Sequence, residues 1–195
     1  SGGETGGEMQ GEVALARTAA LLLEGGIVAL RGFGGYHLAC DATSEAAVRE
    51  LRSRKHREAK PFAVMVRTLA DAHRIATLSE LEARLLERRE RPIVLLRTRS
   101  DHPLAPAVAP GLDTIGLMLP STPLHVLLLE AVERPLVMTS GNRSEEPIAI
   151  GNREARCRLS AIADGFLMHD REILSRTDDS VLRTVADQPV YLRRA

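Results

Sequence analysis

The chain has 195 residues, of which 44% are apolar and 27% charged, so it is long enough for one globular domain with a sizeable core. Lysine plus arginine equals aspartate plus glutamate, at 26 each, which excludes a molecule-wide field that attracts nucleic acid or anionic lipid. Three phenylalanines, two tyrosines and no tryptophan argue against recognition of single-stranded nucleic acid by base stacking.

Cysteine content and apolar run lengths indicate where the chain resides. Cys40 and Cys157 stand far apart and outside any CxxC motif, which predicts no disulfide framework and a cytoplasmic location. No apolar run is long enough to span a bilayer and no signal peptide opens the chain, so no membrane partner is expected. Residues 1–10 are glycine-rich and predict a flexible linker or a boundary, followed by a single domain over 11–195.

The first elements follow from apolar spacing and glycine positions. Apolar positions from Glu12 to Leu23 predict an amphipathic helix that ends at Gly25-Gly26, and residues 27–30 predict a buried strand. Residues 31–41 hold three glycines but match neither a P-loop nor a complete GxGxxG motif. The sequence does not decide whether this stretch is a tight turn or a ligand-binding loop.

Later elements alternate in type along the chain. Thr43 or Ser44 can cap a helix that leads into a basic cluster, and Ser79 caps another helix. The further predicted elements are strands over 62–66, 92–96, 115–119, 135–139 and 165–168, helices over 80–89, 124–131 and 154–163, and a closing hairpin over 180–193. Without a strict βαβ rhythm, this pattern predicts an α/β or α+β fold with a mixed, twisted sheet.

Two short segments are candidates for anion binding. Lys55 and Arg57 lie in a dense basic cluster, which is either a solvated surface or a polyanion site. In an extended chain, side chains two residues apart point to the same side, so both can face one pocket. Together they can neutralise a triphosphate, with arginine as a fork and lysine as a point charge. Ser140-Gly141-Asn142 follows an apolar strand, where open sheets place their ligands, although these residues also form ordinary turns.

Other polar groups give weaker signals. The carboxylates of Asp178 and Asp179 suit either a water-mediated Mg²⁺ site or a turn, and the turn is favoured. No zinc spacing accompanies His37, so no metal ligands are predicted. His125 is predicted to be a polar edge of the core.

Taken together, these segments resemble the YrdC/YciO superfamily of nucleotide-binding domains, which uses a Lys, Arg, Ser, Asn set. The wider match resembles the YrdC-like domain of the HypF hydrogenase maturation carbamoyltransferase family and covers about residues 12–195. It is carried by the motifs GGIVALRGFGGYHLACDAT, RKHREAKPFAVMV, LAPAVAPGLDTIGLMLPSTPLH, PLVMTSGNRSEEPI and HDREILSRTDDSVLR.

The resemblance implies a twisted open sheet with flanking helices around a concave, positively lined nucleotide cavity. In this cavity, with Mg²⁺ as cofactor, carbamate made from carbamoyl phosphate would react with ATP to give carbamoyl-adenylate and pyrophosphate. A further domain would pass the carbamoyl group to a HypE-type acceptor protein. The resemblance implies Lys55 and Arg57 as the catalytic, charge-stabilising pair. The implied nucleotide ligands are Lys55, Arg57, Ser140 and Asn142, with Arg31, His37, Thr139 and Arg176 as further cavity residues.

Departures from the superfamily pattern favour carbamate over threonine. Threonylcarbamoyl-AMP synthases carry Thr-x-Thr/Glu-x-Tyr-Gly where this chain has residues 32–37, and an arginine where it has Met118. The chain also lacks an acylphosphatase loop, paired zinc-finger cysteines and a carbamoyl-transfer segment, so we expect one domain of a larger carbamoyltransferase.

Three alternatives stay open. One is a threonylcarbamoyl-AMP synthase of tRNA modification, and another is an O-carbamoyltransferase of antibiotic biosynthesis. The third is a module that binds nucleotide or double-stranded RNA. Zero net charge and few aromatics count against the third, so nucleic acid is not an expected partner.

Overall fold

The computed structural model describes residues 9–143, 146–170, 173 and 175–194. Its strands are β1 (Val28–Arg31), β2 (Tyr36–Asp41), β3 (Ala63–Met65), β4 (Ala76–Thr77), β5 (Ile93–Thr98), β6 (Thr114–Met118), β7 (Leu136–Ser140), β8 (Gly165–Leu167), β9 (Val181–Val185) and β10 (Gln188–Arg193). Its helices are α1 (Gly11–Leu23), α2 (Glu45–Lys55), α3 (Leu69–Ile75), α4 (Glu80–Leu86), α5 (Pro123–Val132) and α6 (Asn152–Leu159), with a 3-10 turn η1 (Pro106–Val108).

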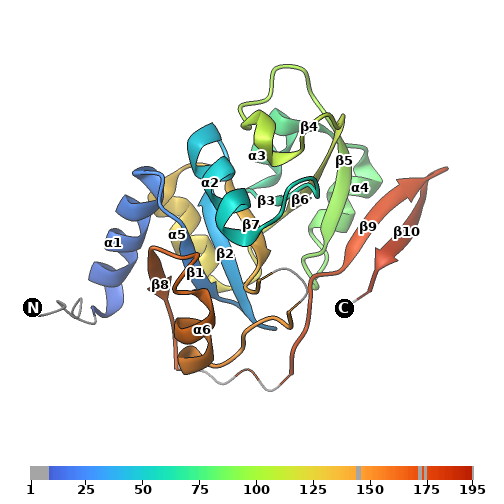
Figure 1. Cartoon of the computed structure of the whole chain (residues 1–195). Coiled ribbons are helices and arrows are strands. Elements are labelled where there is room, and N and C mark those ends of the chain that lie inside the picture. The colour runs from blue at the N-terminus through green and yellow to red at the C-terminus, as the bar shows by residue number, and fades with distance from the viewer. Residues whose placement is uncertain (1–8, 144–145, 171–172, 174, 195) are drawn as a thin grey trace, which may run out of the picture.

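One mixed sheet forms the centre of the molecule (Figure 1). Its strand order is β10-β9-β5-β6-β3-β7-β2-β1-β8, and β4 pairs with β5. The β1–β8, β3–β6 and β5–β9 pairs are parallel, whereas the β1–β2, β2–β7 and β5–β6 pairs are antiparallel. The predicted mixed α/β fold is confirmed.

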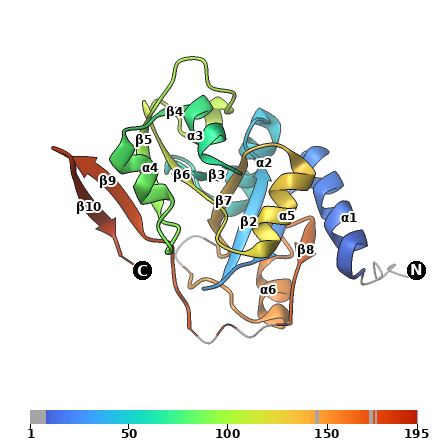
Figure 2. The ribbon, with the colours of Figure 1, turned by 180° about the vertical axis from the view of Figure 1, so that it is seen from behind.

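Helices cover the sheet on both faces, because successive side chains of its inner strands are buried on opposite sides. Val28 and Leu30 belong to a core cluster with α1 and α5, whereas Ala29 belongs to a second cluster with α2, α3, α4 and α6. Figure 2 shows α5 crossing the sheet beside α1. Of the described helices, none has both the length and the apolar character needed to cross a membrane.

Helix ends mostly follow the predicted capping chemistry. The Ser44 side chain accepts from the Ala47 amide and begins α2, and Ser79 with Glu82 forms a capping box at α4. After α1, Gly25 takes a φ of 89°, the left-handed region that glycine adopts without cost. The predicted linker over 1–10 lies almost wholly outside the described residues.

The largest correction concerns residues 31–41, which were predicted to be a turn or a loop. Only residues 32–35 form a turn, because Tyr36–Asp41 is β2, an inner strand between β1 and β7. Its side chains at Tyr36, Leu38 and Cys40 are fully buried. The preceding glycines obscured a strand that burial on both faces stabilises.

Smaller differences have local causes. α3 and β4 lie in a stretch for which no element was predicted. α6 begins at Asn152 rather than 154, because the Glu154 carboxylate accepts from the amides of Ile150 and Gly151 and caps the helix. Lys55 is not in extended chain but is the last residue of α2, followed by His56 in the left-handed conformation.

Candidate functional site

The end of α2 meets the end of β7 through one buried lysine. Lys55 is 2% exposed, and its Nζ donates to the carbonyl oxygen of Ser140 at 2.5 Å. It also donates to the carbonyl oxygen and Oδ1 of Asn142, both at 2.8 Å. The structure thus brings together two predicted segments that lie 85 residues apart in the sequence.

The environment of Lys55 balances opposing effects on its charge. Burial, and then the neighbouring charge of Arg57, lower the pKa of Lys55 to about 7. The three oxygen acceptors favour the ammonium form and oppose that shift. An anion that binds near Lys55 would therefore raise its pKa and increase the share of the ammonium form.

The Ser140-Gly141-Asn142 turn is held tightly against β2. Ser140 Oγ donates to Asn142 Oδ1 at 2.7 Å, and the Gly141 amide donates to the Tyr36 carbonyl at 2.6 Å. A Cβ built on Gly141 would lie 2.6 Å from the Tyr36 carbonyl oxygen, so the close approach requires glycine. This packing fixes where the hydroxyl and amide groups of the turn lie.

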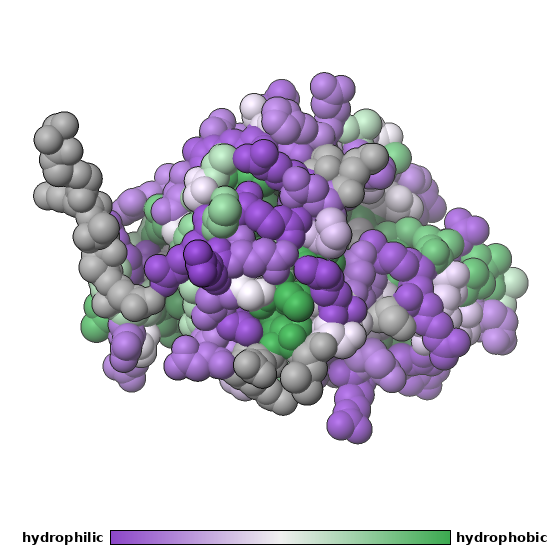
Figure 3. Space-filling model, turned by 60° about the horizontal axis from the view of Figure 1, so that its bottom comes forward, coloured by the Kyte–Doolittle hydropathy of each residue, from purple (hydrophilic) through white to green (hydrophobic). Residues whose placement is uncertain are grey.

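A cavity of about 380 Å³ adjoins this turn. Three predicted residues, Arg57, Thr139 and Ser140, line it. The remainder of its lining is an apolar set with a few charged groups: Pro61, Phe62, Ala63, Ile93, Leu95, Leu112, Thr114, Gly116, Met138, Asp178, Asp179, Val181 and Arg193. Figure 3 shows hydrophobic residues framed by hydrophilic ones on the lower face of the molecule. A mixed lining of this kind is typical of ligand sites.

The basic cluster divides into residues with different roles. Arg52 donates to the carbonyl oxygens of Ala107 and Val108, and Arg54 pairs with Glu50 and Asp164, so both hold neighbouring segments in place. Arg57 also donates to main-chain carbonyl oxygens, those of Lys60 and Pro61, but unlike Arg52 and Arg54 it lines the cavity. Its guanidinium carbon is 5.1 Å from the Phe62 ring centroid.

Burial and then the charges of Arg52 and Arg193 lower the pKa of Arg57. The guanidinium still remains charged near neutrality, as arginine does in proteins. The cavity wall therefore carries two arginines, Arg57 and Arg193, together with two carboxylates, Asp178 and Asp179.

Asp178 and Asp179 connect the last strands to the cavity. Arg193 is 2.6 Å from the Asp178 carboxylate and also donates to the Asp179 carbonyl. His37 Nε2 is 3.1 Å from Asp179 Oδ2. Burial opposes the negative charge of Asp179, but His37 and Arg193 outweigh it and lower the pKa of this carboxyl. Arg193 had no sequence signal, because only the β10-β9-β5 order brings it to this wall.

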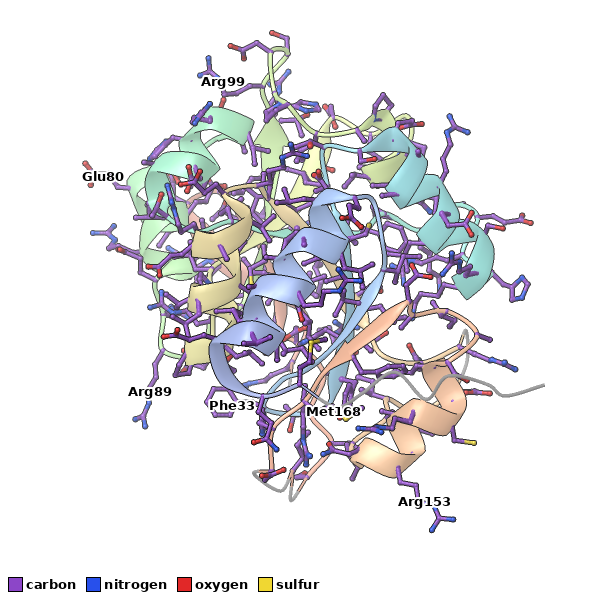
Figure 4. All side chains as sticks on the ribbon, turned by 90° about the vertical axis from the view of Figure 1, so that its left-hand side faces the viewer. Phe33, Glu80, Arg89, Arg99, Arg153 and Met168 are labelled. Atoms are coloured by element: carbon purple, nitrogen blue, oxygen red, sulfur yellow. The ribbon has the colours of Figure 1, made fainter. Side chains whose placement is uncertain are left out.

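Five predicted site residues do not line the cavity. Lys55, Asn142 and His37 bond to Ser140 or Asp179, which do line it, whereas Arg31 and Arg176 lie elsewhere. Arg31 donates to the Asn152 side chain and, at 2.9 Å, to the His169 carbonyl, and Arg176 donates to the Ile148 carbonyl at 2.9 Å. Neither lines the cavity, and both lie in the surroundings of α6. Phe33, labelled in Figure 4, is 59% exposed on the turn after β1.

A second cavity, of about 360 Å³, is lined by Arg67, Asp71 and Arg134 among others. None of the predicted site residues lines it. The chemistry therefore concentrates at the cavity beside Ser140.

Comparison with known proteins fits this geometry. The Sua5/YciO/YrdC family model, described as telomere recombination, matches residues 20–195. The chain belongs to the Sua5/YciO/YrdC family. Within this family, it is 52% identical over 200 residues to the carbamoyltransferase HypF2 of Cupriavidus necator, covering 93% of this chain and 25% of that relative.

Solved structures of the Sua5/YciO/YrdC family share the fold. Full-length HypF in a phosphate- and nucleotide-bound form superimposes with a TM-score of 0.90 at 47% identity, covering 93% of this chain and 29% of that one. The human threonylcarbamoyl-AMP synthase is 31% identical over 161 residues, covering 80% of this chain and 57% of that enzyme. The chain spans about a quarter of the length of its HypF relatives.

Proposed function

We propose that this domain forms carbamoyl-adenylate from ATP and carbamate, as the YrdC-like part of a HypF-type carbamoyltransferase in NiFe-hydrogenase maturation. One observation carries the proposal. A buried lysine, a hydroxyl–amide turn and an arginine-lined cavity converge in a chain that is 52% identical to a named carbamoyltransferase. A related HypF structure holds phosphate and nucleotide, which supports ATP as the co-substrate.

The reaction needs charge stabilisation more than a protein nucleophile. A carbamate oxygen attacks the α-phosphorus of ATP, a new P–O bond forms, and the bond from the α-phosphorus to the bridging oxygen breaks. Pyrophosphate leaves with the electron pair. Arg57 in the cavity wall and the buried Lys55 stabilise the charge on the phosphate oxygens. Ser140 and Asn142 orient the adenylate; of these two, Ser140 lines the cavity, as does Thr139.

The residues present fit a metal that arrives with the nucleotide. Among the described residues, no group of three or more His, Cys, Asp or Glu side chains could hold an ion by itself. Mg²⁺ usually binds through one or two carboxylates together with substrate phosphates and water. Asp178, which lines the cavity, is the carboxylate we assign as its protein ligand, and the ion would neutralise the leaving pyrophosphate.

The remaining steps belong to a longer protein. We propose that residues 11–195 form one domain of a multidomain carbamoyltransferase and that carbamoyl transfer to a HypE-type acceptor occurs outside it. Arg31 and Arg176 donate to main-chain carbonyl oxygens around α6 and hold that region in place. Both cysteines are free, Cys40 buried and Cys157 exposed, which supports a cytoplasmic location.

One assay separates adenylation of carbamate from the alternatives. The chain is incubated with ATP, Mg²⁺ and carbamate, with and without threonine, and pyrophosphate release and the adenylate mass are measured. We expect carbamate-dependent pyrophosphate that threonine does not increase. A product that forms only with threonine would replace the proposal by the synthase activity of the human relative. Nucleotide or double-stranded RNA binding without pyrophosphate release would indicate a non-catalytic module.

A further inference from the structure

Two histidines near the cavity, the partly buried His37 and the buried His125, have no role in the chemistry above. His37 lies on β2, opposite Ser140 of β7 in the strand pairing. His125 lies in the first turn of α5 and has no exposed surface. Their ring centroids are 6.0 Å apart, so they form one imidazole pair at the edge of the candidate nucleotide site.

Each imidazole has one nitrogen engaged and one left over. His37 Nε2 contacts Asp179, which lines the cavity, and His125 Nδ1 is 3.3 Å from Ser121 Oγ. His37 Nδ1 and His125 Nε2 are buried and have no hydrogen-bond partner within the described part of the chain. Buried polar atoms are seldom left unpaired in folded proteins. Two such atoms on neighbouring rings therefore indicate a ligand position.

The surroundings shift the pKa values of the two rings in opposite directions. Burial opposes charge on His37, but the hydrogen bond to Asp179 and its charge outweigh burial, and the pKa of His37 is raised. Burial, and then the charge of His37, lower the pKa of His125 to about 3. With Nε2–H donated to Asp179, His37 Nδ1 donates as well when the ring is protonated, whereas neutral His125 accepts at Nε2 when its Nδ1–H donates to Ser121.

We propose that the His37–His125 pair binds the acyl group of the substrate, the carbamate, and limits its size. This inference rests on the proposed function. Carbamate has carboxylate oxygens that accept and an amine that donates, which matches a neighbouring N–H donor and nitrogen acceptor. A Cβ built on Gly32 would lie 3.1 Å from His37 Nδ1, so the ring packs against bare main chain. We infer that the rings leave less room for an acyl group that carries an amino-acid side chain.

The deciding experiment is a titration of the wild-type chain with ring-¹⁵N-labelled histidine, followed by NMR. Ammonium carbamate is added in the presence of Mg²⁺ and a non-hydrolysable ATP analogue. We expect saturable shifts of the His37 and His125 ring signals and none for His73, which is exposed on α3. Nucleotide binding without shifts at His37 and His125 would overturn the inference and leave the adenylation proposal intact. Absence of nucleotide binding would overturn the proposed function and, with it, this inference.

Kinetics of His37→Gln and His125→Gln give a second readout, with His73→Gln as the matched control. Loss of one hydrogen bond to the acyl group should raise the KM for carbamate about tenfold and leave the KM for ATP unchanged. An unchanged KM for carbamate in both folded variants would overturn the inference. If His125→Gln does not fold, the wild-type titration decides.

Discussion

Replacing Lys55 by methionine tests the site most directly, because this side chain joins its two halves. Methionine keeps most of the apolar stem and removes the ammonium, which makes three hydrogen bonds at 2.5, 2.8 and 2.8 Å. Lys60→Met is the matched control, since Lys60 belongs to the same basic cluster but is exposed. Lys55 and Lys60 are the two lysines of the chain.

The expected magnitude follows from the exchange of one hydrogen bond. The ammonium has three donors, all engaged by Ser140 and Asn142 oxygens, so a contact to the triphosphate replaces one of these acceptors by a phosphate oxygen. A hydrogen bond to a charged group contributes about 1.5–3 kcal/mol, so loss of this contact should weaken ATP binding roughly 10- to 150-fold. The same substitution removes a donor from the Asn142 carbonyl oxygen, whereas the Ser140 carbonyl still accepts from the Asn142 amide and Asn142 Oδ1 still accepts from the Ser140 hydroxyl. It also removes a costly buried charge. We therefore expect a loss of only about 1–3 kcal/mol in unfolding free energy.

Two measurements separate these effects. Isothermal titration calorimetry gives the ATP dissociation constant, and urea unfolding gives the free energy of unfolding. A folded Lys55→Met protein that binds ATP as tightly as the wild type and Lys60→Met would refute the assignment of Lys55 to the triphosphate. Lys55 would then act only as a clamp between α2 and β7.

Three further predictions use the same assays. Arg57→Ala should weaken ATP binding by about 1.5–3 kcal/mol with little change in stability, and unchanged affinity by calorimetry would remove Arg57 from the site. Because the pKa of Lys55 is about 7 and a bound triphosphate favours the ammonium, ATP binding near pH 8 should take up protons and weaken as pH rises. Calorimetry in buffers of different ionisation heat measures this uptake, and an equal uptake in Lys55→Met would exclude Lys55 as its source. Gly141→Ala should lower the unfolding free energy by roughly 1–3 kcal/mol, because the new Cβ would meet Tyr36; a wild-type urea midpoint would contradict this.

Helices and strands were predicted correctly where the apolar periodicity and the capping residue lie within the element itself. The helix of α2 begins at Ser44 as its side chain dictates, and β7 lies where its apolar run predicts it. β2 was missed because it lacks the alternation of apolar and polar residues that marks a strand with one exposed face. Both of its faces are buried, so Leu38 and Ala39 alike are apolar. Only the sheet order, which local sequence does not specify, shows that this strand lies at the centre.

The site was predictable as a set of residue types but not as contacts. Sequence patterns selected Lys55, Arg57, Ser140 and Asn142, whereas the reversal of the chain at His56 decides which of the two basic residues is buried. Arg193 carried no distinctive local signal, and the Asp178-Asp179 pair favoured a turn over a binding site. They reach the cavity through parallel pairing of β9 with β5, a long-range contact.

Lys55 joins α2 to the turn after β7, so binding of a ligand to Lys55 is expected to change the stability of the fold. Its ammonium stabilises the turn after β7, and the turn in turn supplies the hydroxyl and amide proposed for the adenylate. Anything that stabilises the ammonium therefore also stabilises the connection between α2 and β7. A nucleotide that binds only the folded chain adds stability according to its concentration relative to its dissociation constant. ATP should thus raise the melting temperature of the wild type more than that of Lys55→Met at equal ligand concentration, because the variant has lost the group through which the triphosphate acts on both segments.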